Sequence, residues 1–333
     1  MKQNKLFHSK AVVVALAFFM AAACGLGEPS SGAAYSSVRY RGDVSAAACL
    51  ADAVSSARTS IKLALNKFVG TELIEVLNDK ADSGVAVDVV YSAANAGTIG
   101  GLSGEVGKRA GNTGNMQSNF AIIDDDTVVF FSDCALSEPA TIAITIRQAD
   151  LIQTLNKEFS QMFKDGLFGT AKQNLINTQI VFPSVSGDID MYLLPRQVNS
   201  GAYRNDVIAY ICTRVRQARA SVDVYAGAYN NAVLNTTFTL VKNNGPAPYF
   251  CSGYMATPPN PNFVDDMLAN GKSLSCNIII IDAGTSDAVL IFTTFPFAAA
   301  ATMNASDGVA LFIRGETVEQ IKASLDATVS ALL

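Results

Sequence analysis

The feature that most restricts how this 333-residue chain can fold is an internal repeat. The run Ala57–Leu63 matches Ala218–Val224, 161 residues later, and both runs open with Ala-Arg and continue into alternating apolar residues. Asn119–Asp124 likewise matches Asn277–Asp282, since four apolar residues lie between an Asn and an Asp in each. A sequence that repeats in this way predicts two copies of one structural unit, rather than two unrelated domains.

Further matched landmarks extend the repeat and predict its fold class. A helical pattern in each copy ends at a glycine suited to a helix C-cap, Gly84 in the first copy and Gly245 in the second. Each copy reads helix, strand, helix, strand, buried strand, strand, helix, which predicts an α/β unit with a mostly buried mixed sheet flanked by helices. The matched helical segments are 71–82 and 231–244, then 150–163 and 317–332, and the strand-like runs 85–91 and 247–251 lie between them.

Composition limits the function. Half of the residues are hydrophobic and 16% are charged, which supplies a large core and excludes disorder. The formal net charge of −5 argues against nucleic acid as a partner. The chain has one histidine, His8, in a segment that we expect to be removed. A mature chain without histidine excludes mechanisms that need an imidazole base, nucleophile or zinc ligand.

The first residues are typical of an export signal. The segment 1–10 carries three lysines and no acid, and Ala11–Ala23 is uncharged but shorter than the roughly 20 residues that a transmembrane helix needs. We therefore expect 1–23 to be a signal peptide. The residues Ala21-Ala22-Ala23 before Cys24 resemble a bacterial lipobox, with Ala21 where Leu is usual. That resemblance implies an acyl (palmitate-type) lipid anchor on Cys24. The alternative is ordinary cleavage with a plain Cys24.

The expected consequence is an exported lipoprotein of the cell envelope, periplasmic or at the cell surface, whose first partner is the membrane. Residues 24–40 are small and polar, which predicts a flexible stalk. Five cysteines follow Cys24 in the sequence. Because this number is odd, at least one of them has no disulfide partner within the chain, and none has metal-binding spacing. We expect small buried thiols at all of them. They are Cys49, Cys134, Cys212, Cys251 and Cys276.

Around Met116–Asp124 the pattern resembles the phospholipase D superfamily, in which each of two repeats carries an H-x-K-x(4)-D motif on a buried strand, followed by G-S. The positions of His, Lys and Asp are held by Gln117, Asn119 and Asp124 in the first copy and by Ser275, Asn277 and Asp282 in the second. The G-S element corresponds to Ser132 and, in the second copy, to Thr293 or Thr294. The resemblance implies two tandem repeats, 41–180 and 181–333, packed as a pseudo-dimer.

The replacements decide the expected chemistry. In the family one imidazole attacks phosphorus, the other protonates the leaving group, and the lysines neutralise phosphate charge. Amide and hydroxyl side chains do none of this near neutral pH. We therefore expect a pseudoenzyme without cofactor or metal, with a binding or scaffolding role. The alternatives are a residual phosphodiesterase or phospholipase-type hydrolase, and a surface adhesin that contacts host receptors through Arg41-Gly42-Asp43.

Alternate residues of a strand face the same side, so Gln117 and Asn119 are expected to point together, as are Ser275 and Asn277. If the copies pack as in the family, these four side chains meet at a cleft, and the remaining motif residues Asp124, Ser132 and Asp282 complete the candidate site. One interpretation is a pocket for a small uncharged polar ligand or an unknown protein partner. The other is that the polar side chains satisfy one another across the interface.

An acidic run and a glycine-rich run could each be taken for a ligand-binding loop, but both are better explained as surface turns or loops. Asp124-Asp125-Asp126 is expected to form a hairpin turn rather than a calcium site, because the spacing of a calcium loop is missing. The glycine-rich run Gly97–Gly114 lacks the pattern of a phosphate-binding loop, and we expect it to be a mobile surface loop.

Overall fold

A computed structural model of the chain describes residues 37–41, 45–67, 71–111, 116–132, 141–172, 180–182, 189–195, 206–227, 229–244, 250–255, 274–297 and 306–332. All of them belong to one compact unit. The predicted signal peptide and Cys24 lie outside these residues and stay predictions, as does most of the predicted stalk. No helix within the described ranges combines the length and the apolar character needed to span a bilayer.

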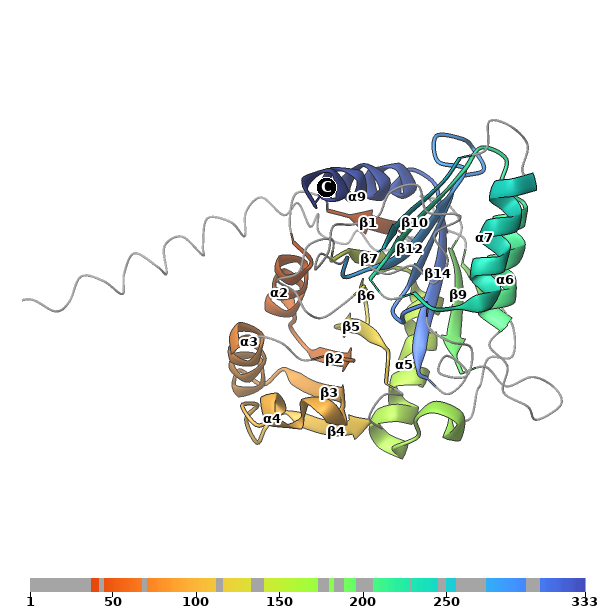
Figure 1. Cartoon of the computed structure of the whole chain (residues 1–333). Coiled ribbons are helices and arrows are strands. Elements are labelled where there is room, and N and C mark those ends of the chain that lie inside the picture. The colour runs from red at the N-terminus through yellow and green to blue at the C-terminus, as the bar shows by residue number, and fades with distance from the viewer. Residues whose placement is uncertain are drawn as a thin grey trace, which may run out of the picture. The chain divides into compact units, whose positions relative to one another are not determined.

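The first copy builds a seven-stranded sheet in the order β1-β7-β6-β5-β2-β3-β4 (Figure 1). β2, β3 and β4 run parallel to one another, and the other neighbouring pairs are antiparallel. The sheet is mixed, as predicted. Its strands are β1 (Ser37–Tyr40), β2 (Ser60–Leu65), β3 (Ala86–Ser92), β4 (Gly107–Gly111), β5 (Asn119–Ile123), β6 (Thr127–Phe131) and β7 (Ala143–Arg147).

The second copy builds a seven-stranded sheet in the order β11-β10-β12-β13-β14-β9-β8. β10 and β11 are parallel, and the remaining neighbours are antiparallel. Its strands are β8 (Ile180–Phe182), β9 (Ile189–Leu194), β10 (Ser221–Ala226), β11 (Phe250–Met255), β12 (Asn277–Ile281), β13 (Val289–Thr293) and β14 (Gly308–Arg314). Six strands of the described residues therefore follow one order and one set of directions in both sheets, which confirms the repeat; β4 and β8 lie at opposite edges of this shared pattern.

The helices repeat in the same way (Figure 1). α2 (Ala46–Ser56) and α3 (Thr71–Asp82) share a hydrophobic cluster with one face of the first sheet. α6 (Asp206–Arg216) and α7 (Ala232–Asn244) do the same on the second sheet. α5 (Ala149–Ser160) and α9 (Thr317–Leu332) follow the last strand of each copy and pack into the central core. The helices predicted at 71–82 and 317–332 are confirmed to the residue.

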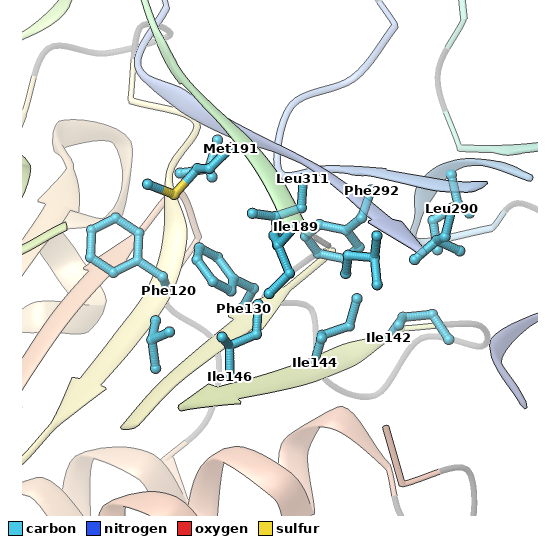
Figure 2. Packing of buried hydrophobic residues seen from close by; sticks show 14 of the residues in the cluster. Phe120, Phe130, Ile142, Ile144, Ile146, Ile189, Met191, Leu290, Phe292 and Leu311 are labelled. Atoms are coloured by element: carbon cyan, nitrogen blue, oxygen red, sulfur yellow. The ribbon is translucent and has the colours of Figure 1, made fainter. Parts of the chain in front are cut away.

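The central core joins the two copies. In β5, Phe120 and Ile122 enter this core, whereas Ala121 and Ile123 face the α2–α3 side, as a period of two requires. β12 alternates in the same way. Figure 2 shows Phe120 and Phe130 of the first sheet together with residues of the second. The second-sheet residues labelled there are Ile189, Met191, Leu290, Phe292 and Leu311. The two sheets thus share one hydrophobic core.

The stalk prediction is wrong for its last four residues. Ser37–Tyr40 forms β1, which pairs antiparallel with β7, and Val38 of this strand is buried in the central core. The predicted order began each copy with a helix, but a strand precedes that helix in both copies, β1 in the first and β9 in the second. A four-residue strand at the edge of a sheet has too few residues to show a clear period of two, so the flanking Ser and Gly residues dominated the pattern.

The prediction of a mobile loop at Gly97–Gly114 is also wrong where the structure describes it. The run holds the end of α4 (Ala96–Ile99), which follows the 3-10 turn η1 (Ala93–Asn95), and then the edge strand β4. At Gly107 a Cβ atom would lie 2.3 Å from Asp88 Oδ1, so a larger residue there would displace the Asp88 side chain. Arg109 fixes the strand further by donating from Nε to the Phe163 carbonyl, at 2.9 Å.

The cysteines agree with the expectation as far as they are described. Cys212 and Cys276 are buried free thiols, and burial raises the pKa of both, so they stay protonated. Cys49 is half-buried. Cys134 and the side chain of Cys251 lie outside the described part of the chain, as do Gly42 and Asp43 of the proposed adhesion tripeptide.

Candidate functional site

The first half-site is a network of amides at the start of β5. Asn66, directly after β2, donates from its backbone N to Asn119 Oδ1 at 2.9 Å and from Nδ2 to Gln117 Oε1 at 2.8 Å. The two motif side chains therefore point to the same side, as predicted. Asn95 donates from Nδ2 to the Asn66 carbonyl at 2.5 Å. Asn66 and Asn95 carry no motif signal, and only the fold brings them here.

The second half-site has no counterpart of Asn66. Gly227 stands 161 residues after it, and its backbone N donates to the Cys276 carbonyl at 2.9 Å instead. A Cβ atom at Gly227 would lie 2.1 Å from the Leu274 carbonyl oxygen, so no larger residue fits. As a result Asn277 Oδ1 has no hydrogen-bond partner within the described residues, although the side chain is only 9% exposed. The two half-sites are asymmetric.

Hydrogen bonds between the copies close a seam at these residues. Asn119 donates from Nδ2 to the Thr294 carbonyl at 3.4 Å, and Ser132 donates from Oγ to the Ser275 carbonyl at 2.8 Å. The Gln117 backbone N donates to the Asp307 carbonyl at 3.0 Å. The structure thus brings Gln117, Asn119, Ser132 and Ser275 together, as expected, and it satisfies much of their bonding capacity within the protein.

The second-copy equivalent of Ser132 is Thr294 rather than Thr293. Ser132 accepts at Oγ from Ile142 N and donates from its backbone N to the Ile142 carbonyl. Thr294 makes the same two bonds with Val309. The two hydroxyls therefore hold the ends of β6 and β13 to the neighbouring chain segments, so the G-S position serves the fold here.

Asp124 and Asp282 are not part of the cleft, which corrects the expected site. Each follows the far end of its strand, five residues and therefore about 17 Å from the Asn at the start. Asp282 accepts at its carboxylate from the backbone N of Arg219, Ala220 and Ser221, at 2.7 to 3.2 Å. Both aspartates therefore fix the helix-to-strand turn before β2 or β10, and this explains why the two matched sequence landmarks are retained together.

Asp124 accepts from the equivalent three backbone N–H groups and from the Thr59 hydroxyl. Burial raises the pKa of Asp124, but these hydrogen bonds outweigh it and the net pKa is lowered. Asp125 pairs with Lys62 at 2.6 Å, and Asp126 pairs with Arg147. The three acids form the predicted hairpin turn. Across the described ranges, no group of three or more His, Cys, Asp or Glu side chains is placed to hold a metal ion.

A buried charge cluster adjoins the seam. Lys172 follows η3 (Gly169–Ala171), and its Nζ lies 2.8 Å from Asp307 Oδ1 and contacts Glu158 Oε1 of α5. The side chains are 0%, 0% and 3% exposed, respectively. One sequence signal points to this cluster: Glu158 lies on the helix stripe of Leu151 and Leu155, where an apolar residue is expected.

A separate groove of about 290 Å³ lies between α5 with its π-helical extension η2 (Gln161–Asp165) and the strands β2 and β3. Burial raises the pKa of Asp88 in this groove, against the lowering effect of Lys62 and Lys164. None of the predicted site residues lines it. The lining residues are Lys62, Asp88, Gln153, Asn156, Lys157, Phe159, Ser160, Phe163 and Lys164.

We compared the sequence and the structure of the chain with those of known proteins. Residues 39–172 match the family model described as transcriptional regulator TrmB, EBD N-terminal subdomain. No curated protein matches the chain. The solved phosphatidylserine synthase of Haemophilus influenzae Rd KW20 is similar over 88% of this chain and 85% of its own, with 10% identity and a TM-score of 0.60. The two chains share one fold, which agrees with the fold expected from the resemblance to the phospholipase D superfamily.

Two further structures show how far the likeness extends. Polyphosphate kinase from Porphyromonas gingivalis is similar over 87% of this chain and 47% of its own, with 10% identity and a TM-score of 0.57. Nuc from Salmonella typhimurium, described as a phospholipase D family member, is 18% identical over 39% of this chain and 93% of its own, with a TM-score of 0.35. The likeness to the synthase and to the kinase thus spans both copies of the repeat.

Proposed function

We propose that this protein is an exported lipoprotein, tethered to the membrane through Cys24, whose phospholipase-D-like domain binds a ligand or scaffolds a partner without catalysis. The observation that carries the proposal is the seam. At the positions where the superfamily motif has His and Lys, amide and hydroxyl side chains stand, and those of the first copy, Gln117 and Asn119, are engaged in neutral hydrogen bonds. None of these groups exchanges a proton near neutral pH.

We infer that the ligand of the seam is small, uncharged and polar. Asn277 Oδ1 is a buried acceptor without a described partner, and an orphaned buried acceptor costs about 1–3 kcal/mol until a donor reaches it. A hydroxyl-bearing ligand supplies such a donor, whereas a phosphate ester supplies further acceptors and negative charge. The match to a family named for a transcriptional regulator supports a non-catalytic use of this repeat.

Activity and binding test the proposal together. The purified protein should not hydrolyse bis(p-nitrophenyl) phosphate or phosphatidylcholine, because no nucleophile replaces the missing imidazoles. Glycerol and glucose should raise the thermal unfolding temperature of the wild type, and Asn277→Ala should weaken binding about tenfold, the value of one hydrogen bond.

Lys164→Ala is the matched control, since it alters the separate groove and leaves the seam intact. It should bind both polyols as the wild type does. Stabilisation by inorganic phosphate but by neither polyol would contradict the neutral-ligand proposal. Phosphodiester turnover that Asn119→Ala or Asn277→Ala abolishes would instead establish the hydrolase that the similarity to a synthase and a kinase favours.

The tether is tested separately. The chain expressed in a bacterium should partition into the detergent phase of Triton X-114 and incorporate radiolabelled palmitate, because two or more acyl chains hold a protein firmly on a bilayer. Cys24→Ser should lose the label and move to the aqueous phase, whereas Cys49→Ser should behave as the wild type. Detergent partitioning that persists in Cys24→Ser would contradict anchoring at this residue.

A further inference from the structure

The buried cluster of Lys172, Glu158 and Asp307 has no role in the proposed binding function. Its three side chains come from the residue after η3, from α5 and from the segment before β14, so it lies between the two copies. The side chains of Lys172 and Asp307 are fully buried. An ammonium and two carboxylates without water are costly to keep charged, and replacing such groups by neutral ones is often stabilising.

The contacts hold the Lys172 amine, which can act as a nucleophile, close to the carboxyl carbon of Asp307. Lys172 Nζ lies 2.8 Å from Asp307 Oδ1, so the carboxyl carbon lies within about 4 Å of the nitrogen. Nζ also donates to the Leu194 carbonyl at 2.7 Å, which limits its movement. Reacting atoms held about 3–3.5 Å apart react as an intramolecular pair with a large rate advantage.

The two oxygens of Asp307 have different surroundings. Oδ1 accepts from the Gly169 backbone N at 2.8 Å, and Gly169 has φ +56°, a conformation that favours glycine. Oδ2 is buried and has no hydrogen-bond partner among the described residues. Oδ1 is thus held by a backbone donor of the kind that stabilises an oxyanion, and Oδ2 is the oxygen free to leave.

We propose that this chain forms an intramolecular isopeptide bond between Lys172 Nζ and Asp307 Cγ, with Glu158 as the proton-transfer group. Glu158 contacts the same Nζ and comes from a third element, so it is placed to take a proton from the nitrogen. Its side chain then has to rotate to pass the proton to Asp307 Oδ2, which has no hydrogen-bond partner among the described residues. Burial raises the pKa of Glu158, which suits a carboxyl that must both hold and release a proton.

The step balances without any co-reactant. One proton passes from the Lys172 ammonium through Glu158 to the Asp307 carboxylate, which leaves a neutral amine. The nitrogen lone pair attacks Cγ and forms the C–N bond, while the Gly169 N–H stabilises the negative charge on Oδ1. The C–Oδ2 bond then breaks with its electron pair, and Oδ2 takes a second proton from nitrogen and departs as water. Ammonium and carboxylate thus become one amide and one water.

Peptide mapping of the full folded chain tests the bond. Trypsin should yield a cross-linked species made of residues 165–196, uncut at Lys172, and 273–314, lighter than the two separate peptides by one water. Lys172→Arg should abolish this species completely, since arginine keeps the charge but is not deprotonated. Glu158→Gln should keep the shape and lower the cross-linked fraction at least tenfold after equal incubation.

A second Lys–Asp pair in the chain tests whether a short distance alone, without burial, is enough for the bond to form. Lys322 Nζ also lies 2.8 Å from an aspartate oxygen, that of Asp326, but these side chains are 24% and 43% exposed. Peptides of this pair should stay unlinked in the same digest. Full recovery of free peptides 165–172 and 273–314 from protein that unfolds cooperatively would overturn the proposal, and the cluster would then be a non-covalent ion group. Neither result depends on whether the seam binds a ligand.

Discussion

Replacing Asp282 by alanine should destabilise the chain by about 4 kcal/mol, because one carboxylate satisfies three consecutive backbone N–H groups before β10. Asp282 is 4% exposed, so water does not fully replace its carboxylate. Asp282 also has φ +54°, where alanine costs roughly 1–2 kcal/mol. Urea unfolding followed by circular dichroism measures the loss, since both copies share one core and should unfold together.

Two variants isolate the cause. Asp282→Asn keeps an acceptor oxygen and tolerates the left-handed conformation, so it should lose less than half as much stability. Asp287→Ala lies in the same turn region but is exposed, so its effect should stay within about 0.5 kcal/mol. Equal losses for Asp282→Ala and Asp287→Ala would contradict the role of Asp282 in fixing the turn before β10.

The repeat could be predicted from sequence because both copies keep the same hydrogen-bonding device. Arg58 to Ser60 and Asp124 lie far apart in the chain, yet the backbone of the former bonds to the carboxylate of the latter. The buried strands were equally visible, since a run such as Asn277–Ile281 is apolar on both faces. Local patterns of this kind survive without knowledge of the tertiary structure.

The details of the site could not be predicted, because they depend on contacts between segments without a shared pattern. Asn66 is a single polar residue after a strand, and it becomes the centre of the first half-site only because β2 lies beside β5. The asymmetry of the half-sites follows from Gly227, whose close approach to Leu274 is a tertiary property. Lys172 and Asp307 lie 135 residues apart, with no motif to connect them.

Lys172→Met should be less stable than Lys172→Arg by about 4 kcal/mol at neutral pH, since removing the positive charge from a buried ion group leaves uncompensated charge in the core. The loss should depend on pH. The pKa of Glu158 is already raised by burial, and the Lys172 ammonium is the main influence that lowers it. Without the ammonium that pKa rises further, so the folded variant holds a proton that the unfolded chain releases above about pH 4.3. Stability of the variant therefore falls as pH rises, and the deficit should be larger at pH 8 than at pH 5.

Lys172→Arg is the reference for this measurement, because neither variant can form an amide at this position and only the arginine keeps the positive charge. The difference in stability between the two variants therefore reports the charge alone, whatever the state of the wild type.

Adding Glu158→Leu to Lys172→Met should recover part of the loss and remove most of its pH dependence. Arg41→Met breaks a pair whose side chains are 40% and 56% exposed, and it should cost less than about 1 kcal/mol. A Lys172→Met deficit that stays constant from pH 5 to pH 8 would show that lost packing, rather than an unpaired carboxylate, destabilises the core.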